Sequence, residues 1–336
     1  MKSVLVVGAG YWGTKCIDTL LHNFPSIVVK VVEKNADYRA GVSLRFPSLE
    51  VFGTLEEAIE KGDVKSAVIT APARWHGQLA LTLLRAGIHV LVEKPFNLTP
   101  EEFAEASLHE SRGLVVNAGY LYVHNPLISA VDKIVKSKQF GNLIFVESLR
   151  EGFGAFRQDV NVVRDLMVHD ISIALGLVRG QSWNIDSATA RIPLNTGFFA
   201  EAEATMRFES GMVAKMVSSQ FRPVKNRRTT FFLEDAIIVA DEQNELRPFR
   251  VFSPPSGLLK TGTAEQWQGE EYAELQELDA VSFNVESPRK TLAKSLSSFL
   301  DSVASKVPNK ADLTFAQEVD AIATAIESAL ERGEGR

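Results

Sequence analysis

The stretch GAGYWG near the N-terminus limits the possible folds of this chain more than any other feature. It places Gly8, Gly10 and Gly13 in the spacing G-x-G-x-x-G, directly after a β-branched run at residues 3–7. The residues that follow, from Tyr11, have the spacing of a helix. The first glycine permits a tight turn, the second lets a pyrophosphate approach the backbone, and the third lets helix and strand pack closely. Because a helix N-terminus binds anions, the stretch predicts a dinucleotide site rather than a glycine-rich turn without a ligand.

An acidic residue at the expected distance supports this interpretation. Glu33 follows Gly13 by 20 residues and ends the second predicted strand, residues 27–34. An acid in this position bonds the ribose hydroxyls of the adenosine half of the dinucleotide. A carboxylate also repels a 2′-phosphate, so Glu33 favours NAD. Lys34 leaves NADP open, since a neighbouring cation could accept that phosphate if Glu33 turned away.

Strands and helices alternate through the first part of the chain. Further strands are expected at 66–70, 89–93 and 114–119, with helices at 54–61, at 76–86 and after residue 99. Two of these helices open with capping boxes, Thr54 with Glu57 and Thr99 with Glu102. Apolar strands that do not alternate with polar residues are typical of a parallel sheet covered on both faces. Residues 1–120 are therefore expected to form a doubly wound dinucleotide-binding domain of the Rossmann type.

The second part of the chain has a different pattern. After a helix at 126–137, strands are expected at 143–150, 184–192, 201–209, 211–221, 227–235 and 236–242. In EAEATMRF (201–208) polar and apolar residues alternate, and Ser210-Gly211 predicts a hairpin turn. Residues 121–336 are expected to form an open, mainly antiparallel sheet with helices on one face, for substrate binding and oligomerisation. Two amphipathic helices end the chain, and they could pack back on the first domain.

Composition and charge exclude several classes of protein. The 336 residues are 45% hydrophobic and carry a net charge of -6, which gives no basis for general binding to nucleic acid. No apolar run reaches the roughly 18 to 20 residues of a membrane span. Cys16 is the only cysteine, so no intramolecular disulfide can form, and the N-terminus shows no signal pattern. A cytoplasmic protein without nucleic-acid or membrane partners is expected.

The segment RDLMVHDI (164–171) combines apolar residues with Asp165, His169 and Asp170. At helical spacing Asp165 and His169 lie one turn apart on the same face. The pair could be a buried contact, half of a metal site, or a general base with its orienting carboxylate. A metal site needs at least three good ligands, and no cluster of Cys or His joins these residues, so no metal is expected. Asp170, about 100° away from His169, is interpreted as a packing acid.

Several motifs together resemble those of the Gfo/Idh/MocA family, the relatives of glucose-fructose oxidoreductase and inositol dehydrogenase. They are GAGYWG, AVITAPARWH (67–76), HVLVEKPF (89–96) and DLMVHD (165–170), and the resemblance covers nearly the whole chain. GYLYVHNP (119–126) and GAFRQDVNVVRDLMVHD (154–170) are most similar to members that act on nucleotide-linked sugars.

The resemblance implies an NAD(P)-dependent oxidation or reduction of a secondary hydroxyl on a sugar or cyclic polyol. It places Lys94 between the nicotinamide ribose and the reacting oxygen, with Asp165 and His169 facing it across a cleft, and with a cis Lys94-Pro95 peptide. Histidine suits the general base because its ordinary pKa is near 6.5. We therefore expect His169 to remove the hydroxyl proton, Asp165 to orient it, and Lys94 to stabilise alkoxide character.

The remaining expected contacts fall into two groups. Besides Gly8, Gly10, Gly13 and Glu33, the cofactor is expected to contact Tyr11, Trp12, Thr70, Ala71, Pro72, His76, Glu93, Lys94 and Pro95. The alternative for His76 is a solvent-facing residue at a helix start. Substrate contacts are expected from Tyr120, Tyr122, Asn125, Arg150, Arg157, Asp165 and His169. Arg150, Arg157 and Arg164 could bind the phosphates of a nucleotide sugar, or could form ordinary ion pairs.

Two other functions remain open beside a sugar dehydrogenase. One is a glycoside hydrolase of the same family, which uses tightly held NAD to oxidise, eliminate and reduce again. The other is a non-enzymatic regulator that binds dinucleotide and sugar. By the same resemblance, a homodimer or homotetramer is expected, formed through the open sheet.

Overall fold

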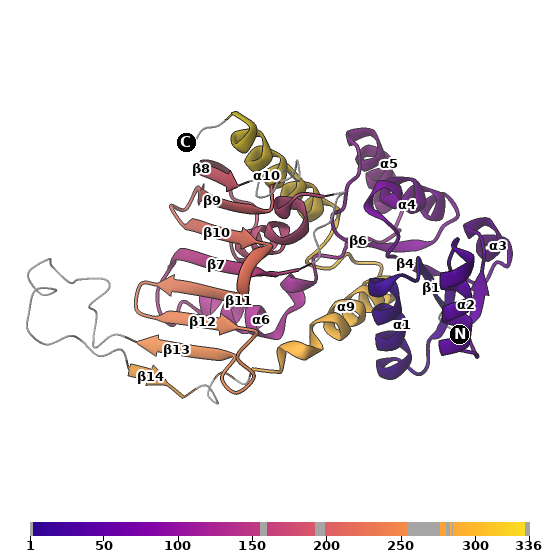
Figure 1. The fold of residues 1–336 in the computed structure, drawn as a ribbon, viewed down its shortest axis with the longest axis horizontal. Helices are drawn as coiled ribbons and strands as arrows, with labels where there is room; N and C mark the ends of the chain where they lie inside the picture. Colours follow the sequence, from indigo (N-terminus) through magenta and orange to yellow (C-terminus); the bar gives the residue numbers. More distant parts are fainter. Residues whose placement is uncertain are drawn as a thin grey trace, which may run out of the picture. The chain divides into compact units, whose positions relative to one another are not determined.

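The computed structural model describes residues 3–154, 160–191, 199–253, 276–279, 283 and 285–332. The chain divides into two compact units, each containing one sheet (Figure 1). The first unit consists of Met1–His124 and Thr291–Asp320, and the second of Asn125–Lys290 and Ala321–Arg336. Helix α10 (Leu313–Arg332) therefore contributes residues to both units.

The first unit contains a six-stranded parallel sheet with the strand order β3-β2-β1-β4-β5-β6. Its strands are β1 (Ser3–Val7), β2 (Val28–Val32), β3 (Glu50–Phe52), β4 (Ser66–Ile69), β5 (His89–Val92) and β6 (Val116–Ala118). The order reverses at β1, so the loops that follow β1 and β4 lie side by side, which is where such sheets bind ligands. The predicted doubly wound sheet is confirmed.

The helices of this unit are α1 (Tyr11–Asn23), α2 (Ala36–Arg45), α3 (Leu55–Glu60), α4 (His76–Arg85), α5 (Pro100–Ser111) and α9 (Thr291–Ser305), with short 3₁₀ turns at Ala73–Trp75 and Leu121–His124. Both predicted capping boxes form, at Thr54 with Glu57 and at Thr99 with Glu102. The sequence did not predict α2, whose only buried residue is Val42, or the three-residue strand β3.

The core of the first unit lies between the sheet and helices α1 and α9. Val6, Val31 and Val68 come from adjacent strands, and they pack with Leu20 of α1 and Phe299 of α9. All five side chains are buried. A segment near residue 300 thus completes the core that the first strands begin.

The second unit contains an eight-stranded sheet with the order β14-β13-β12-β11-β7-β10-β9-β8. Its strands are β7 (Leu143–Phe153), β8 (Trp183–Arg191), β9 (Glu201–Phe208), β10 (Val213–Ser219), β11 (Phe221–Leu233), β12 (Ile237–Asp241), β13 (Phe249–Ser253) and β14 (Gln276–Leu278). Among these strands only β7 and β10 pair in parallel. The predicted, mainly antiparallel sheet is confirmed, although β13 and β14 were not predicted.

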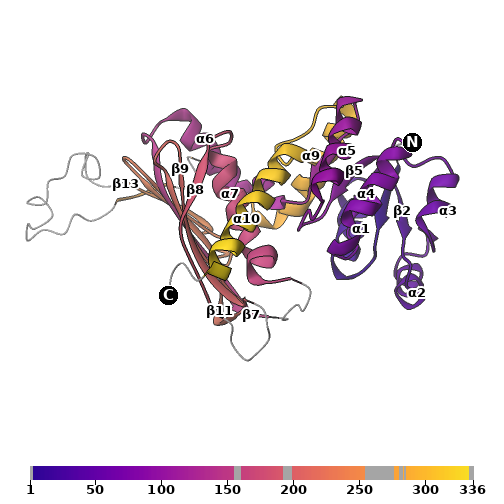
Figure 2. The same ribbon diagram turned by 90° about the horizontal axis from the view of Figure 1, so that it is seen from above.

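The helices of the second unit cover one face of its sheet. They are α6 (Pro126–Ser137), α7 (Val168–Leu177) and the second half of α10, and in the described part of the chain the other face carries no helix (Figure 2). A short turn at Pro288–Lys290 precedes α9. The predicted hairpin turn at Ser210-Gly211 joins β9 and β10, and Gly211 has a φ of 86°.

The segment RDLMVHDI lies between β7 and β8, as predicted, but it is not a regular α-helix throughout. A π-helical turn spans Val163–Met167, and α7 follows directly. Met167, Val168 and Ile171 are fully buried, which accounts for three of the four apolar residues of this segment, and Leu166 is partly exposed. None of the helices in the described ranges is long and apolar enough to cross a membrane.

Candidate active site

The glycine-rich turn after β1 has the geometry of an anion cradle. Gly8 has a φ of 96°, and a Cβ there would lie 2.8 Å from the backbone nitrogen of Ala71. A Cβ at Gly13 would overlap with the carbonyl oxygen of Gly8, whereas a Cβ at Gly10 would meet nothing within 4 Å. Helix α1 starts at Tyr11 with no side-chain cap, because Gly10 is the capping residue. Open space at a helix N-terminus fits a pyrophosphate.

Glu33 lies beside this turn. Its Oε2 accepts a hydrogen bond from the backbone N–H of Ala9 at 2.7 Å, and its Oε1 accepts one from the N–H of Asn35 at 2.8 Å. Arg39 donates to the carbonyl oxygens of Glu33 and Lys34 at 2.8 and 3.1 Å, so a cation besides the exposed Lys34 lies close. The carboxylate is therefore fixed next to the glycine-rich turn by backbone donors.

The loop after β4 is tied to the glycine-rich turn and to the loop after β5. Thr70 donates its hydroxyl to the carbonyl oxygen of Gly8 at 2.6 Å. His76 is only 1% exposed, and its Nδ1 and Nε2 lie 2.8 Å from the carbonyl oxygens of Pro95 and Ala71, respectively. The solvent-facing alternative for His76 is thus wrong. His76 links the loops that contain Ala71 and Pro95, which places its side chain between them.

Lys94 follows β5, next to a buried acid. The Lys94-Pro95 peptide is cis, as expected, and the Lys94 side chain is partly exposed. Glu93 is 8% exposed, and its Oε2 accepts a hydrogen bond from the Lys94 N–H at 3.2 Å. Burial raises the pKa of Glu93 to about 7, while the neighbouring Trp12 side chain and Lys94 act in the opposite direction. A proton can therefore reside on Glu93 near neutral pH.

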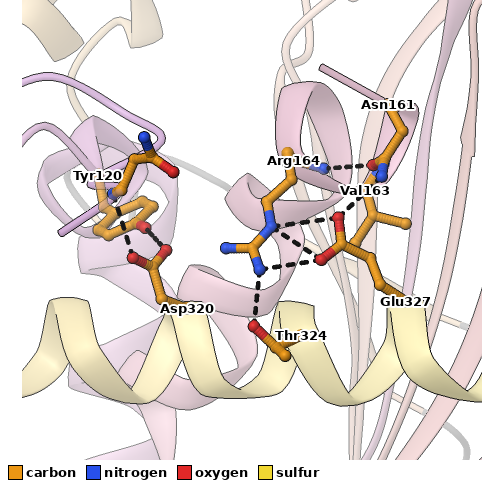
Figure 3. A network of polar contacts seen from close by, with 8 residues as sticks. Tyr120, Asn161, Val163, Arg164, Asp320, Thr324 and Glu327 are labelled. Atoms are coloured by element: carbon orange, nitrogen blue, oxygen red, sulfur yellow. Dashed lines mark hydrogen bonds and ion pairs between the residues drawn. The ribbon is translucent and has the colours of Figure 1, made fainter. Parts of the chain in front are cut away.

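Two residues expected to contact substrate are instead buried in the scaffold. Tyr120 is fully buried and donates its hydroxyl to Oδ1 of Asp320 on α10 at 3.0 Å (Figure 3). Asn125 is also fully buried; its Oδ1 caps α6 through the Leu127 N–H, and its Nδ2 donates to Glu242. These placements argue against direct substrate contact. Tyr122, in the turn before α6, is partly exposed.

In the second unit, the π-helical turn and the start of α7 carry the two candidate catalytic residues. Asp165 is partly exposed, and its Oδ2 accepts a hydrogen bond from Nε2 of Gln220 at 3.1 Å. His169, in the first turn of α7, is 8% exposed. Gln220 follows β10 and was not predicted. The polar run Ser218–Gln220 at the end of an alternating strand is the signal that could have indicated it.

Arg150 forms a buried ion pair. Its Nε lies 3.0 Å from both carboxylate oxygens of Asp170, and its Nη2 lies 2.9 Å from Oδ1. Arg150 is 3% exposed and Asp170 is 1% exposed. Burial raises the pKa of Asp170, and the Arg150 charge opposes that shift. The pair agrees with the interpretation of Asp170 as a packing acid and argues against a phosphate-binding role for Arg150.

Arg164 likewise has carboxylate and hydroxyl partners within its own unit, Glu327 and Thr324 of α10 (Figure 3). Arg157, the third arginine near this segment, lies outside the described residues. Within the part of the chain that the structure describes, no group of three His, Cys, Asp or Glu residues could hold a metal ion.

A parallel sheet in the order 3-2-1-4-5-6, with an open cradle at Gly10 and an acid after β2, defines a dinucleotide-binding protein. Residues 2–120 match the model of the oxidoreductase family with an NAD-binding Rossmann fold, GFO_IDH_MocA. The match covers strands β1 to β6 and helices α1 to α5 of the first unit, and the chain resembles the Gfo/Idh/MocA family of oxidoreductases beyond it as well.

Individual relatives support this resemblance. UDP-N-acetylglucosamine 3-dehydrogenase from Acidithiobacillus ferrooxidans is 25% identical over 308 residues, covering 90% of this chain and 92% of that protein. Its solved structure superposes with a TM-score of 0.80 over 98% of both chains, at 23% identity. GenD2 from gentamicin A biosynthesis, solved with NAD, has a TM-score of 0.80 at 19% identity, covering 99% of this chain and 95% of that chain. The 3-ketoreductase KijD10 from Actinomadura kijaniata, solved with TDP-benzene and NADP, has a TM-score of 0.76 at 17% identity over 98% of both chains.

Proposed function

We propose that this protein transfers a hydride between a nicotinamide dinucleotide and a secondary hydroxyl of a nucleotide-linked sugar. The observation that carries the proposal lies in the first unit. The cradle at Gly10 and the partly exposed Lys94 both follow the carboxyl ends of strands of one parallel sheet. Ligands bind at this edge of such sheets, so a cation is available where the redox end of a dinucleotide would lie.

In the oxidative direction, His169 removes the proton from the reacting hydroxyl, and NAD supplies the hydride acceptor when bound. Asp165 orients the imidazole and stabilises its protonated form, while Lys94 stabilises the negative charge that develops on the substrate oxygen. Gln220 holds the Asp165 carboxylate. These roles for Lys94, Asp165 and His169 follow the expectations from sequence.

The cofactor contacts that we propose centre on the glycine-rich turn and Glu33. Glu33, held by the backbone of Ala9 and Asn35, favours NAD over NADP because its carboxylate repels a 2′-phosphate. Arg39 and Lys34 are the cations that could admit NADP. We propose that His76 acts indirectly, because its ring contacts the two loops rather than open space.

The nucleotide-linked substrate rests on the similarity to UDP-N-acetylglucosamine 3-dehydrogenase, which spans 90% of this chain. Of the expected substrate contacts, we retain Tyr122, Arg157, Asp165 and His169. We now assign Tyr120, Asn125 and Arg150 to the scaffold, since all three are buried with polar partners in the protein. A nucleotide diphosphate would thus bind through other groups than Arg150.

We further propose a cytoplasmic homodimer or homotetramer. A single cysteine in 336 residues suits a reducing compartment. The face of the eight-stranded sheet opposite its helices carries the partly exposed pair Phe145 and Phe232, with ring centroids 5.5 Å apart. Partly exposed aromatic side chains on a sheet face favour association with a second copy.

The proposal is tested by incubating the protein with NAD or NADP and a panel of free sugars, inositols and nucleotide-linked sugars, while nicotinamide absorbance is recorded. Nucleotide-linked sugars are expected to reduce NAD with the highest kcat/KM. Reaction with free polyols alone would contradict the substrate class. Turnover of a glycoside without any change in absorbance would instead support the hydrolase alternative.

A further inference from the structure

Glu327, on the second half of α10, contacts the segment that directly precedes Asp165 (Figure 3). Its carboxylate accepts hydrogen bonds from Nδ2 of Asn161 at 2.8 Å and from Nε and Nη2 of Arg164 at 3.0 and 2.9 Å. Thr324, about one helical turn earlier, accepts a hydrogen bond from the same Nη2 at 2.7 Å. One face of α10 therefore binds two residues of this segment.

Asn161 carries this contact into the backbone of the π-helical turn. Its Oδ1 accepts hydrogen bonds from the N–H groups of Val163 and Arg164 at 2.9 and 3.1 Å, which caps the start of the turn. Its backbone carbonyl accepts a hydrogen bond from the Asp165 N–H at 2.9 Å. Because Glu327 orients the Asn161 side chain, it also fixes the backbone at Asp165.

The turn has a particular need for such support. A π-helical turn is rare, and such turns occur frequently at functional sites. Bonds from a guanidinium to a carboxylate are roughly twice as strong as neutral hydrogen bonds. The Arg164 and Glu327 side chains are only 21% and 19% exposed, so solvent and salt screen them less than a surface pair. Loss of the Glu327 charge should therefore loosen this turn.

We propose that Glu327 is a positioning residue for Asp165, an inference that rests on the proposed function. The π-helical turn, held by Glu327 through Asn161 and Arg164, sets the backbone of Asp165, while Gln220 holds its carboxylate from the end of β10. Arg164 then acts inside the protein rather than on a substrate phosphate. Glu327 is separated from Asp165 by about half the chain, so no local sequence pattern links the two residues.

The first test needs no substrate. In Glu327→Gln the side chain keeps its shape, but its amide group faces the donors of Asn161 and Arg164. Hydrogen exchange at residues 163–168 is expected to rise about tenfold, because a charge-assisted contact is lost. The control is Glu331→Gln, which makes the same change one helical turn further along α10 at an exposed position. Equal exchange in the two variants would overturn the proposal.

The second test uses the activity of the full-length protein. Glu327→Gln is expected to lower kcat about tenfold and to leave the KM for NAD unchanged. An unchanged kcat, in a protein that His169→Ala inactivates, would overturn the positioning role. Absence of turnover in the wild type would count against the proposed function only. The hydrogen-exchange measurement would still show whether Glu327 holds the π-helical turn.

A double-mutant cycle with Arg164→Ala and Glu327→Ala completes the test. If the two residues act as one unit, the double variant is expected to lose no more activity than the worse single variant. Simple additivity of the two losses would contradict a shared role.

Discussion

Glu93 is the buried acid next to Lys94, and its protonation links the stability of the protein to pH. Its pKa of about 7 in the folded protein lies above the ordinary value of 4.5. Between these two values the folded state binds more protons than the unfolded state, so stability falls as the pH rises from about 4.5 to about 7 and then levels off. The change is at most about 3 kcal/mol, at about 1.4 kcal/mol per pKa unit.

We therefore expect Glu93→Gln to remove part of this pH dependence. Urea unfolding at pH 5 and pH 8 measures the effect, because the wild type should lose more free energy of unfolding over this range than the variant. The comparison with the wild type also cancels the contribution of Glu110, whose pKa burial likewise raises to about 7. Equal pH dependence in the two proteins would show that Glu93 is ionised throughout.

Individual residues also mark the limit of what the sequence could predict about the site. Glu33, Lys94 and the glycines follow strands at short, characteristic spacings, so local pattern was enough to indicate them. Tyr120 shows the opposite case. Its position after β6 resembled that of a ligand-facing residue, but its hydroxyl bonds Asp320, 200 residues later in the chain. No local pattern encodes a contact over that separation.

At the scale of elements, close packing of α1 against β1 requires a glycine at position 13. Gly13→Ala is expected to cost about 1–3 kcal/mol in the free energy of unfolding, since a Cβ would overlap with the Gly8 carbonyl oxygen. Gly41→Ala is the control: it lies in α2 with nothing within 4 Å of its Cβ position, and alanine there should add about 0.5–1 kcal/mol. Thermal unfolding measures both. A loss of equal size in the two variants would contradict the packing argument.

The ion pair between Arg150 and Asp170 joins β7 to α7. Asp170→Ala is expected to cost about 3–5 kcal/mol, because it leaves the Arg150 charge buried without compensation. Asp186→Ala, which removes the partner of Arg207 on the surface, should cost about 0–1 kcal/mol. Denaturant unfolding measures the loss in the free energy of unfolding for both variants. A loss below about 1 kcal/mol for Asp170→Ala would refute the assignment of this pair to the scaffold.

The elements that the sequence predicted carry their own local pattern, whereas the elements that it missed do not. The long alternating strands β9 and β10 carry their own signal, as do the helices with capping boxes at Thr54 and Thr99. The helix α2 buries one residue and therefore has no apolar stripe to detect. The π-helical turn was predicted as α-helix, because its support comes from Glu327 on a distant element.

At the scale of the whole molecule, the face of the eight-stranded sheet opposite α6 and α7 determines the expected association. Light scattering after size-exclusion chromatography should give a mass that is a multiple of 37.0 kDa. Phe232→Glu places a charge beside Phe145 and should shift the mass toward the monomer. Leu246→Glu, at a 94% exposed position outside the strands, should leave it unchanged. A monomeric wild type at micromolar concentration would refute the proposed oligomer.

The sequence predicted both sheets. Strands that alternate with helices indicate the parallel sheet of the first unit, and strands that follow one another directly indicate the mainly antiparallel sheet of the second unit. The composition of each unit was less predictable. The chain from Thr291 to Asp320 belongs with the first unit, and Phe299 fills its core. The amphipathic stripe of α9 predicted a helix, but a stripe carries no information about which sheet it covers.

The central claim is that His169 acts as the base in hydride transfer to the nicotinamide. A single-turnover measurement of nicotinamide absorbance, with the best sugar from the panel, tests it most directly. His169→Ala is expected to slow reduction of NAD roughly 100- to 10,000-fold, the range for loss of a general base, while NAD still binds to the first unit. Reduction of NAD at the wild-type rate in His169→Ala would contradict the role of His169 as the base. No reduction of NAD by the wild type with any sugar would contradict the proposed function itself.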